Sequence, residues 1–552
     1  MPRNKLELFR PILSSISKKE NRNFLLQIVK VGLGWQPNFI SLLCGIMVGV
    51  ACPPIGLHYL SWLAFAIFGV VLLKEKMLSP QQAMVHFAAF SLGLNLVVAY
   101  WIFPLIGQRA GFGWIGTALI STIVIGVIVA ISMLYGFVYG WCKRAISGKL
   151  HLWRGRANLG PFPTDVVIQA GFLWGYFVFW DSTEVRLFPF SPIQFSLESK
   201  VLFAAVYYLQ PFGLRLLLFG LAIVLAVAYL SLYKSKKRTF WSVSIFAIAI
   251  CLGTHWGIGS LAVAHLKKGH PFGQPVALLQ DNYHSIRGKE RRLKESSLTS
   301  VEELNVALRH EAGSKLRELQ DNPAEEPEVW VFWSETFFQR FHPEEAQGVF
   351  EGFGHPVDLQ FVGYNRRTEN PKEGKRYYNS VALFHEREGY LGSYHKNILF
   401  PIGEYIPFEK EFPILRKWFP KWGKYSRGDQ VGIFAHPDSN GPVFLVFTCY
   451  EGIFGFYTDR VLQAAGKKYP KRDLIMVNPV NDFPFGRTSE TIQHSMLTRF
   501  QAAKRGLPLV RVNGYGYSEI VSPWGETFKR TERDETTVLT GFLPVKRAIL
   551  RK

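Results

Sequence analysis

The chain contains the stretch FGWIGTALISTIVIGVIVAISMLYGFVYGW (112–141), in which no side chain is charged. Apolar runs of about 20 residues are long enough to cross the hydrocarbon core of a bilayer as helices. The surrounding segment 38–141 holds only four charged residues, Lys74, Glu75, Lys76 and Arg109. Soluble domains lack segments of this kind, so a wholly soluble protein is excluded. The 45 Phe and 15 Trp also exclude a disordered chain.

Apolar runs recur through the first half and predict seven membrane spans. The fifth span is the weakest, because Asp165 and Asp181 bracket a short run, and the sixth could begin only after Pro211. The predicted spans are about 38–55, 57–73, 83–106, 112–141, 165–181, 203–233 and 239–264.

Lysine and arginine are concentrated in alternate loops of this half. Seven precede residue 38, and further clusters follow the second, fourth and sixth spans. Cytoplasmic loops carry such an excess. We therefore predict a cytoplasmic segment at 1–37, a membrane domain at 38–264 and an outer location for the rest. This topology also accounts for much of the net charge of +21, so no nucleic-acid partner is predicted.

Residues 270–552 change character and predict an α/β domain. Amphipathic stretches at 300–320 and 489–506 lie between short apolar runs, a pattern typical of buried strands alternating with helices. These runs are VALLQ (276–280), VWVFW (329–333), SVALF (380–384), VFLVF (443–447), LIMVN (474–478) and LPLVRV (507–512). The last apolar run, VLTGFLPV (538–545), is about half the length that a span needs. It predicts a closing strand and no C-terminal transmembrane helix.

Three reactive side chains each follow a strand-like run: Glu335, Lys396 and Cys449. Side chains at strand ends converge at one edge of an open α/β sheet. Cys449 is also the only cysteine of this half, and an unpaired thiol is a liability in an oxidising compartment unless it is used. The alternative is a buried core cysteine, and composition does not decide between the two.

The motifs around these residues are WSET (333–336), YHKNILFPIGEYIPF (394–408) and TCYEG (448–452). Their order resembles the carbon–nitrogen hydrolase (nitrilase) superfamily, and the multi-span half in front resembles its apolipoprotein N-acyltransferase family. Further matches are LLQDN (278–282), VNPVNDFPFG (477–486), QH (493–494) and VNG (512–514). The resemblance implies an αββα sandwich with Glu335 as general base, Lys396 as cationic helper and Cys449 as nucleophile.

The resemblance also suggests supporting residues. Glu404 matches a family acidic residue beside the lysine and would orient Lys396 or assist proton transfer, and the alternative is a structural salt bridge. Glu451 is a similar case. Tyr450 and Asn481 would either line the pocket or pack in the core.

The sequence departs from the family pattern at three places near the site. Ser334 stands where proline often precedes the glutamate, and Phe483-Pro484 replaces the usual Ala-Trp. Lys504 stands where an acidic residue is expected. These departures leave the three reactive residues intact and put the details of the pocket in doubt.

The stretch EYIPFEKEFPILRKWFPKWGKY (404–425) mixes aromatic residues with lysines. Aromatic rings prefer the depth of lipid headgroups, where lysines can reach water. We predict a membrane lid that includes Trp418 and Trp422, and the alternative is an ordinary packed arm.

The function implied by the resemblance is acyl transfer in the bacterial inner membrane, with the catalytic domain on the periplasmic side. A phospholipid would donate the acyl chain, and a diacylglyceryl-cysteine apolipoprotein would accept it through a cysteine thioester. No metal or cofactor is predicted, because metal-ligand spacings and nucleotide-binding loops do not occur. Two alternatives remain open: a membrane-tethered amidase, and a non-catalytic homologue that binds lipoproteins or lipid.

Overall fold

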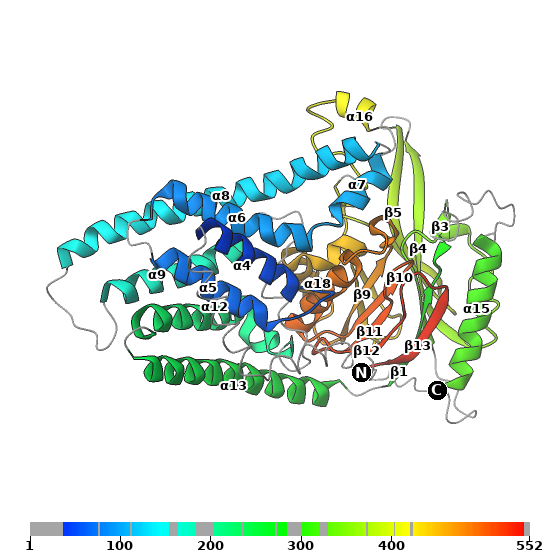
Figure 1. The fold of residues 1–552 in the computed structure, drawn as a ribbon. Helices are drawn as coiled ribbons and strands as arrows, with labels where there is room; N and C mark the ends of the chain where they lie inside the picture. Colours follow the sequence, from blue (N-terminus) through cyan, green and yellow to red (C-terminus); the bar gives the residue numbers. More distant parts are fainter. Residues whose placement is uncertain are drawn as a thin grey trace, which may run out of the picture.

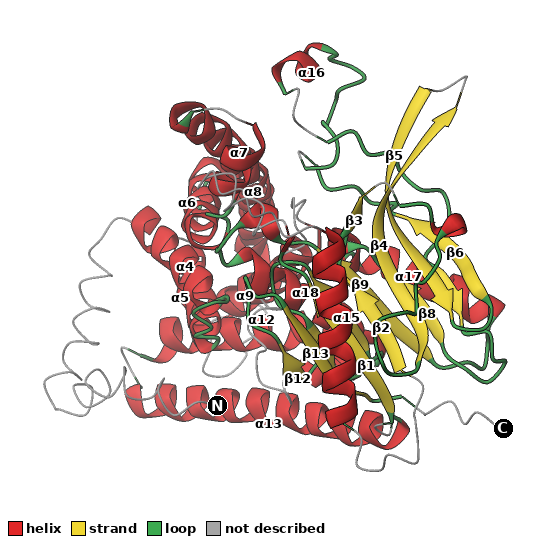
Figure 2. Ribbon diagram, turned by 90° about the vertical axis from the view of Figure 1, so that its right-hand side faces the viewer, coloured by secondary structure: helices red, strands yellow, loops and turns green. Residues whose placement is uncertain are grey.

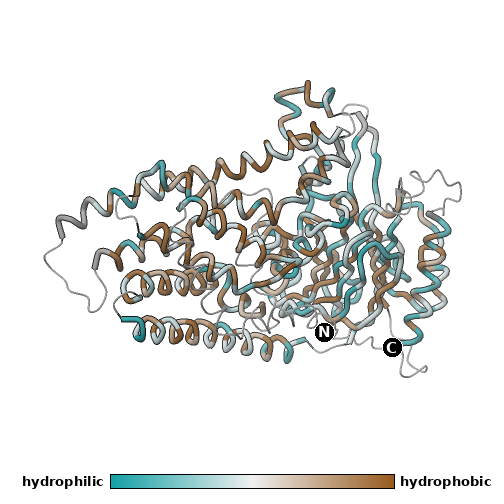
Figure 3. The backbone as a smooth tube through the Cα atoms, viewed as in Figure 1, coloured by the Kyte–Doolittle hydropathy of each residue, from teal (hydrophilic) through white to brown (hydrophobic). Residues whose placement is uncertain are grey.

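The computed structural model has a helical half followed by an α/β half (Figure 1). The backbone of the helical half runs mostly through hydrophobic residues (Figure 3). The structure describes residues 37–74, 78–110, 113–153, 164–183, 203–233, 236–270, 273–283, 301–319, 329–339, 341–370, 374–401, 403–419 and 423–545. Except for Pro37, the predicted cytoplasmic segment 1–37 therefore lies outside the described residues.

The helices of the first half follow the apolar runs. They are α4 (Pro37–Ala51), α5 (Tyr59–Lys74), α6 (Pro80–Val98), α7 (Ile102–Ala110), α8 (Trp114–Trp153), α9 (Thr164–Thr183), α12 (Val206–Leu232) and α13 (Lys237–Gly269). Four of them, α6, α8, α12 and α13, are long and apolar enough to cross a membrane, whereas α4 and α5 are apolar but shorter. Each predicted span coincides with helical residues, but seven membrane crossings stay a prediction.

The sixth span contains the break that its proline predicts. Gln210 has φ 54° and ψ 168°, and helical geometry resumes from Pro211. Proline lacks the N–H that would continue the helix and clashes with the preceding turn. Of the two predicted starts of this span, the structure therefore favours the one after the break at Gln210.

The third predicted span, 83–106, is wrong as a single helix. α6 ends at Val98, and a short turn separates it from α7. Groups from the second half of the chain stabilise this turn. Gln493 Nε2 donates to the Val98 carbonyl at 3.4 Å, and the backbone N–H of Ser489 donates to the Tyr100 hydroxyl at 2.9 Å. The first bond gives the Val98 carbonyl a partner that a continuous helix would have supplied, and the second attaches the Tyr100 side chain to the start of α18.

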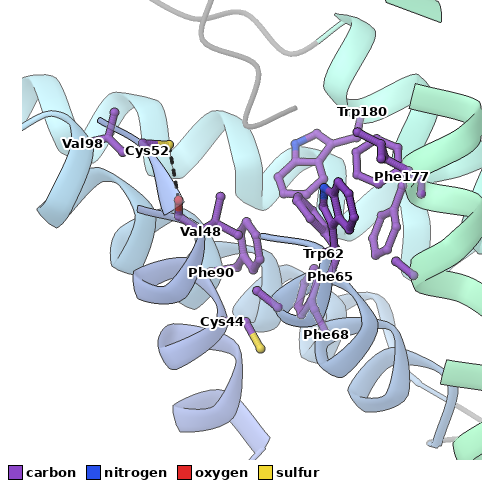
Figure 4. Close-up of a cluster of buried hydrophobic side chains, with 14 of the residues drawn as sticks. Cys44, Val48, Cys52, Trp62, Phe65, Phe68, Phe90, Val98, Phe177 and Trp180 are labelled. Carbon is purple, nitrogen blue, oxygen red and sulfur yellow. Dashed lines mark hydrogen bonds between the residues drawn. The ribbon is translucent and has the colours of Figure 1, made fainter. Parts of the chain in front are cut away.

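Aromatic rings and close helix contacts form the core of the helical half (Figure 4). The ring of Phe68 stacks on that of Phe90 with their centroids 4.7 Å apart. Glycines bring α4 and α6 together: a Cβ on Gly45 would lie 1.9 Å from the Phe90 carbonyl oxygen, and one on Gly93 2.2 Å from that of Leu42. Small residues at helix contacts are typical of membrane helix pairs.

The α/β half contains two sheets. The first has the order β13-β1-β2-β4-β5-β6, with β3 paired to β4, and the second has the order β12-β11-β10-β9-β8-β7. The strands are β1 (Gln274–Gln280), β2 (Val329–Trp333), β3 (Phe338–Gln339), β4 (Val357–Asn370), β5 (Gly374–His385), β6 (Gly389–His395), β7 (Ile433–Ala435), β8 (Val443–Val446), β9 (Leu474–Val480), β10 (Leu509–Asn513), β11 (Glu519–Val521), β12 (Thr527–Arg530) and β13 (Thr537–Leu543). The helical elements are α15 (Val301–Glu318), η1 (Pro343–Glu345), α16 (Ile414–Trp418), η2 (Cys449–Ile453), α17 (Gly455–Lys468), η3 (Phe483–Phe485) and α18 (Glu490–Arg505).

Each sheet packs one face against the other sheet and the opposite face against helices. Buried side chains from both sheets, including Phe332, Phe361 and Phe444, form the central layer. A second cluster joins α15 to the first sheet, and a third joins α17 and α18 to the second. Figure 2 shows α15 lying across the strands of the first sheet. The predicted αββα sandwich is confirmed.

The last apolar run is the closing strand that its length predicts. β13 pairs antiparallel with β1, from Gln274 opposite Leu543 to Gln280 opposite Thr537. Each of the other quoted apolar runs also overlaps a strand. Residues after 545 lie outside the described part, so the predicted lack of a C-terminal membrane helix stays a prediction.

The two halves meet around α18. Besides its bond to α6, Gln493 donates to the Pro53 carbonyl at 3.2 Å. The ring of Trp101, between α6 and α7, lies edge-on to that of Phe485 with their centroids 5.5 Å apart. The apolar cluster of the helical half continues through this joint and includes Cys449. The joint therefore brings the candidate nucleophile to the apolar side of the α/β half.

Candidate active site

The three predicted reactive residues come from the ends of three strands. Glu335 follows β2, Lys396 directly follows β6, and Cys449 begins η2 just after β8. All three are buried: Lys396 is 1% exposed, Glu335 5% and Cys449 9%. Charged side chains are rarely buried unless they are paired, and these carry partners that join them into one cluster.

Lys396 lies between two carboxylates. Its Nζ is 3.4 Å from Glu335 Oε1 and 3.0 Å from a carboxylate oxygen of Glu404. Asn379 on β5 donates from Nδ2 to Glu335 Oε1 at 2.5 Å and to Glu404 Oε1 at 2.8 Å. Glu404 also accepts the backbone N–H of Phe400 at 2.8 Å. Glu404 therefore ties Lys396 to the loop that follows, and a role in orienting the lysine or in proton transfer stays a prediction.

The backbone of Cys449 is strained and braced. Its φ is 52°, a conformation that residues other than glycine seldom adopt. Asn478 on β9 donates from Nδ2 to the Phe447 carbonyl at 2.6 Å and to that of Cys449 at 3.1 Å. Strain of this kind costs on the order of 1–3 kcal/mol and is concentrated at functional sites. The turn thus keeps the thiol at the end of β8 instead of letting it follow the strand.

The electrostatics favour a protonated thiol beside a base. Burial and the neighbouring Glu335 raise the pKa of Cys449 well above its usual value, although Lys396 lowers it. Burial also raises the pKa of Glu335, which accepts a hydrogen bond from the Cys449 thiol. Burial alone would lower the pKa of Lys396, but Glu404 and Glu335 raise it well above its usual value. The resting site therefore holds a thiol, a carboxyl group able to remove its proton and a permanent ammonium group.

Glu451 forms hydrogen bonds with the backbone of two loops beside the site. Its carboxylate accepts the backbone N–H groups of Asn397 at 2.6 Å, Ile398 at 2.8 Å and Thr448 at 2.8 Å. The Tyr394 hydroxyl donates to it at 2.8 Å. Burial raises the pKa of Glu451 to about 7, against these hydrogen bonds. Glu451 thus ties the loop after Lys396 to the turn before Cys449.

Tyr450 and Asn481 lie at the edge of this cluster. The ring of Tyr450 packs edge-on against those of Phe400 and Phe454, with centroids 5.0 and 4.7 Å away. Asn481 is half-buried, and its Oδ1 accepts the backbone N–H of Phe483 at 3.2 Å. Both contacts are structural, and a role in lining the pocket stays a prediction.

The predicted lid forms an arm that starts and ends at the site. The backbone N–H of Tyr425 donates to the Glu404 carbonyl at 3.0 Å and closes the base of the arm. Between these two residues α16 projects away from the sandwich (Figure 2). Trp418 is 59% exposed, and Phe408 and Phe412 are 70% and 58% exposed. Trp418 is therefore no part of a packed core, whereas Trp422 lies outside the described residues.

The departures from the family pattern have local explanations. The Ser334 hydroxyl donates to Asp281 of the LLQDN motif, which fixes the start of the turn that carries Glu335. Phe483 and Pro484 belong to η3. Lys504 lies near the end of α18, 3.4 Å from Asp459, and makes an ion pair on the side of the helix that faces α17. These contacts leave the three reactive residues together.

Two features of the site are not predicted by the sequence. Asn379 bridges the two carboxylates, but its role depends on the pairing of β5 with β6, which a single sequence does not reveal. The QH motif contributes His494, whose Nδ1 lies 2.9 Å from Asp482 Oδ1, directly behind Cys449. The QH motif matches the family pattern, but the sequence alone predicts no role for this histidine.

Two buried groups of described residues bring ligand-type side chains together. One is Asp358 with His385 and His436, and the other is Cys449 with Asp482 and His494. In the first, Nδ1 of each histidine accepts a backbone N–H, so each Nε2 carries a proton and donates to Asp358. A metal ion would need those nitrogens deprotonated. The absence of a metal stays a prediction.

Both halves of the chain are similar to known proteins. Residues 359–550 match the carbon–nitrogen hydrolase family. An apolipoprotein N-acyltransferase from Geobacter metallireducens is 24% identical over 506 residues, which cover 91% of this chain and 88% of that protein. Another from Bradyrhizobium diazoefficiens is 27% identical over 325 residues, which cover 55% of this chain and 58% of that protein. A solved amidase from Nesterenkonia sp. AN1 is 17% identical, covering 49% of this chain and 94% of its own, with a TM-score of 0.31.

The alignment with the Geobacter protein extends over both halves of the chain. Apolar helices long enough to cross a membrane precede the matched domain, as expected for a membrane protein. The chain is therefore similar to apolipoprotein N-acyltransferases over most of its length, and residues 359–550 of its second half match the carbon–nitrogen hydrolase family.

Proposed function

We propose that this protein transfers a fatty acyl group from a phospholipid to the amino terminus of a diacylglyceryl-cysteine apolipoprotein. The observation that carries the proposal is the position of Cys449. It lies beside Glu335 and belongs to the same apolar cluster as the membrane-type helices. A water-soluble substrate would not need an apolar cluster that joins the nucleophile to the membrane-type helices. An acyl chain that arrives from the bilayer would need one. The names of the relatives supply the acceptor.

The first half-reaction forms a thioester on Cys449. Glu335 removes the thiol proton as Sγ attacks the carbonyl carbon of the phospholipid ester. The ester C–O bond breaks, Glu335 returns the proton to the leaving oxygen, and a lysophospholipid departs. General base catalysis is needed because the thiol is protonated at rest. The ammonium group of Lys396 stabilises the negative oxygen of the tetrahedral intermediate.

The second half-reaction passes the acyl group to an amine. The amino group of the acceptor attacks the thioester carbonyl, the C–S bond breaks, and an amide is released. A site enclosed by apolar side chains excludes water, which would otherwise hydrolyse the thioester. We place the reaction at the outer face of the bacterial inner membrane, as the predicted topology requires.

The test of this proposal is the amino terminus of a lipoprotein. We expect mass spectrometry to find a third acyl chain, linked as an amide, in cells that contain the protein. In matched cells that lack it, the amine should be free. A lipoprotein terminus that is unchanged by loss of the protein would contradict the acceptor, and release of free fatty acid by the purified protein would instead support a hydrolase.

A membrane lid gives a further expectation. We propose that the exposed arm 404–425 inserts its apolar side chains among lipid headgroups. Trp418→Ser would remove about 1.5–3 kcal/mol of apolar burial, so the apparent KM for phospholipid in vesicles should rise about tenfold or more. The acylation rate with a short-chain, water-soluble ester should stay near that of the wild type, because that substrate needs no contact between the arm and the bilayer.

The matched control is Val306→Ser. Val306 is 65% exposed on α15, on the outer face of the sandwich, and its loss should leave the KM for vesicles unchanged. Thermal unfolding of the Trp418 variant should match that of the wild type. A lowered melting temperature without a change in KM would contradict the lid and assign Trp418 to the fold.

A further inference from the structure

Buried polar atoms without a hydrogen-bond partner gather at the start of α18. Among the described residues they include both carboxyl oxygens of Glu490, Thr491 Oγ1, Gln493 Oε1 and His494 Nε2. The side chain of His494 is only 2% exposed and that of Glu490 only 1%. Buried polar atoms in native proteins nearly always have partners, supplied by the protein, by internal water or by a ligand. This end of α18 therefore gathers buried polar groups whose capacity for hydrogen bonds is not used by the described residues.

His494 lies directly beside the candidate nucleophile. A ring nitrogen of His494, a carboxyl oxygen of Asp482 and Sγ of Cys449 all lie within 4.8 Å of one another. His494 Nδ1 faces Asp482 Oδ1 at 2.9 Å. An ionised carboxylate only accepts hydrogen bonds, so Nδ1 carries the proton and Nε2 keeps a free electron pair. The ring is thus oriented as a proton acceptor.

Asp482 is fixed as an ionised group. It also accepts Arg511 Nη2 at 3.0 Å and Asn513 Nδ2 at 2.6 Å. Burial alone would raise the pKa of Asp482, but His494 and Arg511 hold it below its usual value. A carboxylate with three N–H donors keeps both its charge and its position, so it orients His494 and stabilises the charged ring after proton uptake.

Four titratable or charged groups face His494. They are Asp482 from the turn after β9, Arg511 from β10, Cys449 from η2 and Glu490 from α18 itself, whose Oε1 lies 3.6 Å from Nδ1. Burial and Arg511 lower the pKa of His494, so the ring is neutral at pH 7. Burial and Asp482 raise the pKa of Glu490 well above its usual value, which favours the uncharged form of this carboxyl group. The Cys449 carbonyl also faces the ring and favours its charged form.

The two half-reactions differ in their proton balance. In the first, the thiol proton ends on the leaving oxygen, and no proton is gained or lost. In the second, an α-amino group arrives mostly as an ammonium at neutral pH, since its pKa is about 7.7–8.0. It loses two protons as the C–N bond forms and the C–S bond breaks. Glu335 can return one of them to the sulfur, and the other must leave the site.

We propose that His494, oriented by Asp482, accepts this second proton from the incoming ammonium and releases it to solvent. The inference rests on the proposed function and deepens it, because it assigns a separate proton acceptor to the second half-reaction. Glu335 and His494 then serve Cys449 from two different elements, the end of β2 and the first turns of α18. The proton would then leave His494 by way of the neighbouring polar side chains of Glu490 and Thr491.

The experiment measures each half-reaction alone on the full-length protein in detergent. A phospholipid with a labelled acyl chain forms the acyl-enzyme, and a diacylglyceryl-cysteinyl peptide is then added between pH 6.5 and 9. We expect His494→Gln to form the acyl-enzyme at the wild-type rate. Its aminolysis should be about tenfold slower one pH unit below the pKa of the amine, because only the uncharged tenth of the amine then reacts. Above that pKa the rates should converge.

The matched control is His436→Gln. His436 is also buried and donates from Nε2 to Asp358 at 2.9 Å, but it lies outside the site. Losing this pair should change stability and leave the pH profiles of both half-reactions intact. A His494 variant that slows both half-reactions equally at every pH would assign the residue to the fold and overturn the inference.

The wild-type protein gives a test that does not depend on any variant. Its aminolysis rate should vary little with pH below the pKa of the amine. A tenfold fall per pH unit would mean that only the free amine reacts, and it would overturn the inference without touching the acyl-enzyme. If the wild type forms no acyl-enzyme on Cys449, the proposed function itself fails, and the inference fails with it.

Discussion

Cys449→Ala should leave no acyl group on the protein after incubation with phospholipid, whereas the wild-type chain should gain the mass of one acyl chain. The adduct accumulates because the first half-reaction needs no acceptor, and a thioester can form only on Sγ. Mass spectrometry of the intact protein measures it, and hydroxylamine should remove it, as expected for a thioester. The expected loss is complete, because no other described side chain in the cluster replaces the thiol.

A cysteine of the helical half provides the control for this prediction. Cys251→Ala removes a thiol that is buried in α13, and the adduct should form at the wild-type rate. An acyl adduct that persists in the Cys449 variant would move the nucleophile elsewhere. Cys449 would then return to the interpretation as a buried core cysteine.

Glu335→Gln should slow the formation of the thioester by about 10²–10⁴-fold, the usual contribution of a general base. Glutamine keeps an oxygen that can accept the Asn379 hydrogen bond of 2.5 Å, so the fold should be preserved. It cannot remove the thiol proton, and the pKa of that thiol is raised by burial. Single-turnover kinetics with labelled phospholipid measures the loss.

The pH dependence gives this prediction a second readout. Burial raises the pKa of Glu335, so the wild-type rate should fall with acid at a pH above the ordinary carboxyl range of about 4. The Gln variant should lose this dependence, since it has no carboxylate to protonate. Glu344→Gln, which breaks a surface pair with Arg366, should retain the wild-type rate and profile. A Glu335 variant within tenfold of the wild type would assign the proton transfer to another group.

The local sequence pattern predicted most of the helices and strands, because runs of apolar residues indicate which segments are buried. It failed at the third span, where Ala99–Trp101 itself contains neither proline nor glycine, although Pro104 follows three residues later in the first turn of α7. The break depends on Gln493 and Ser489, which lie almost four hundred residues away in sequence. Pro104 is a local sign of this break, whereas the bonds from Gln493 and Ser489 cannot be recognised from the residues of the span.

In the site, too, some features can be predicted from the local sequence and others depend on distant contacts. Glu335, Lys396 and Cys449 follow strand-like runs and carry recognisable motifs, so sequence alone could group them. Asn379 bridges two carboxylates only because strand pairing brings its carbonyl opposite the Lys396 backbone N–H, at 2.9 Å. The pairing of His494 with Asp482 likewise depends on how α18 packs against the second sheet. These roles arise from tertiary contacts that no local pattern encodes.

The joint around α18 has a consequence for how this protein can be handled. Gln493 and Phe485 use the helical half as part of their own surroundings, and the cluster that contains Cys449 is completed by membrane-type helices. A fragment that begins near residue 270 would turn this interior into a water-exposed apolar surface, which favours aggregation. The α/β half is therefore no independent soluble module, and its chemistry has to be studied in the intact chain.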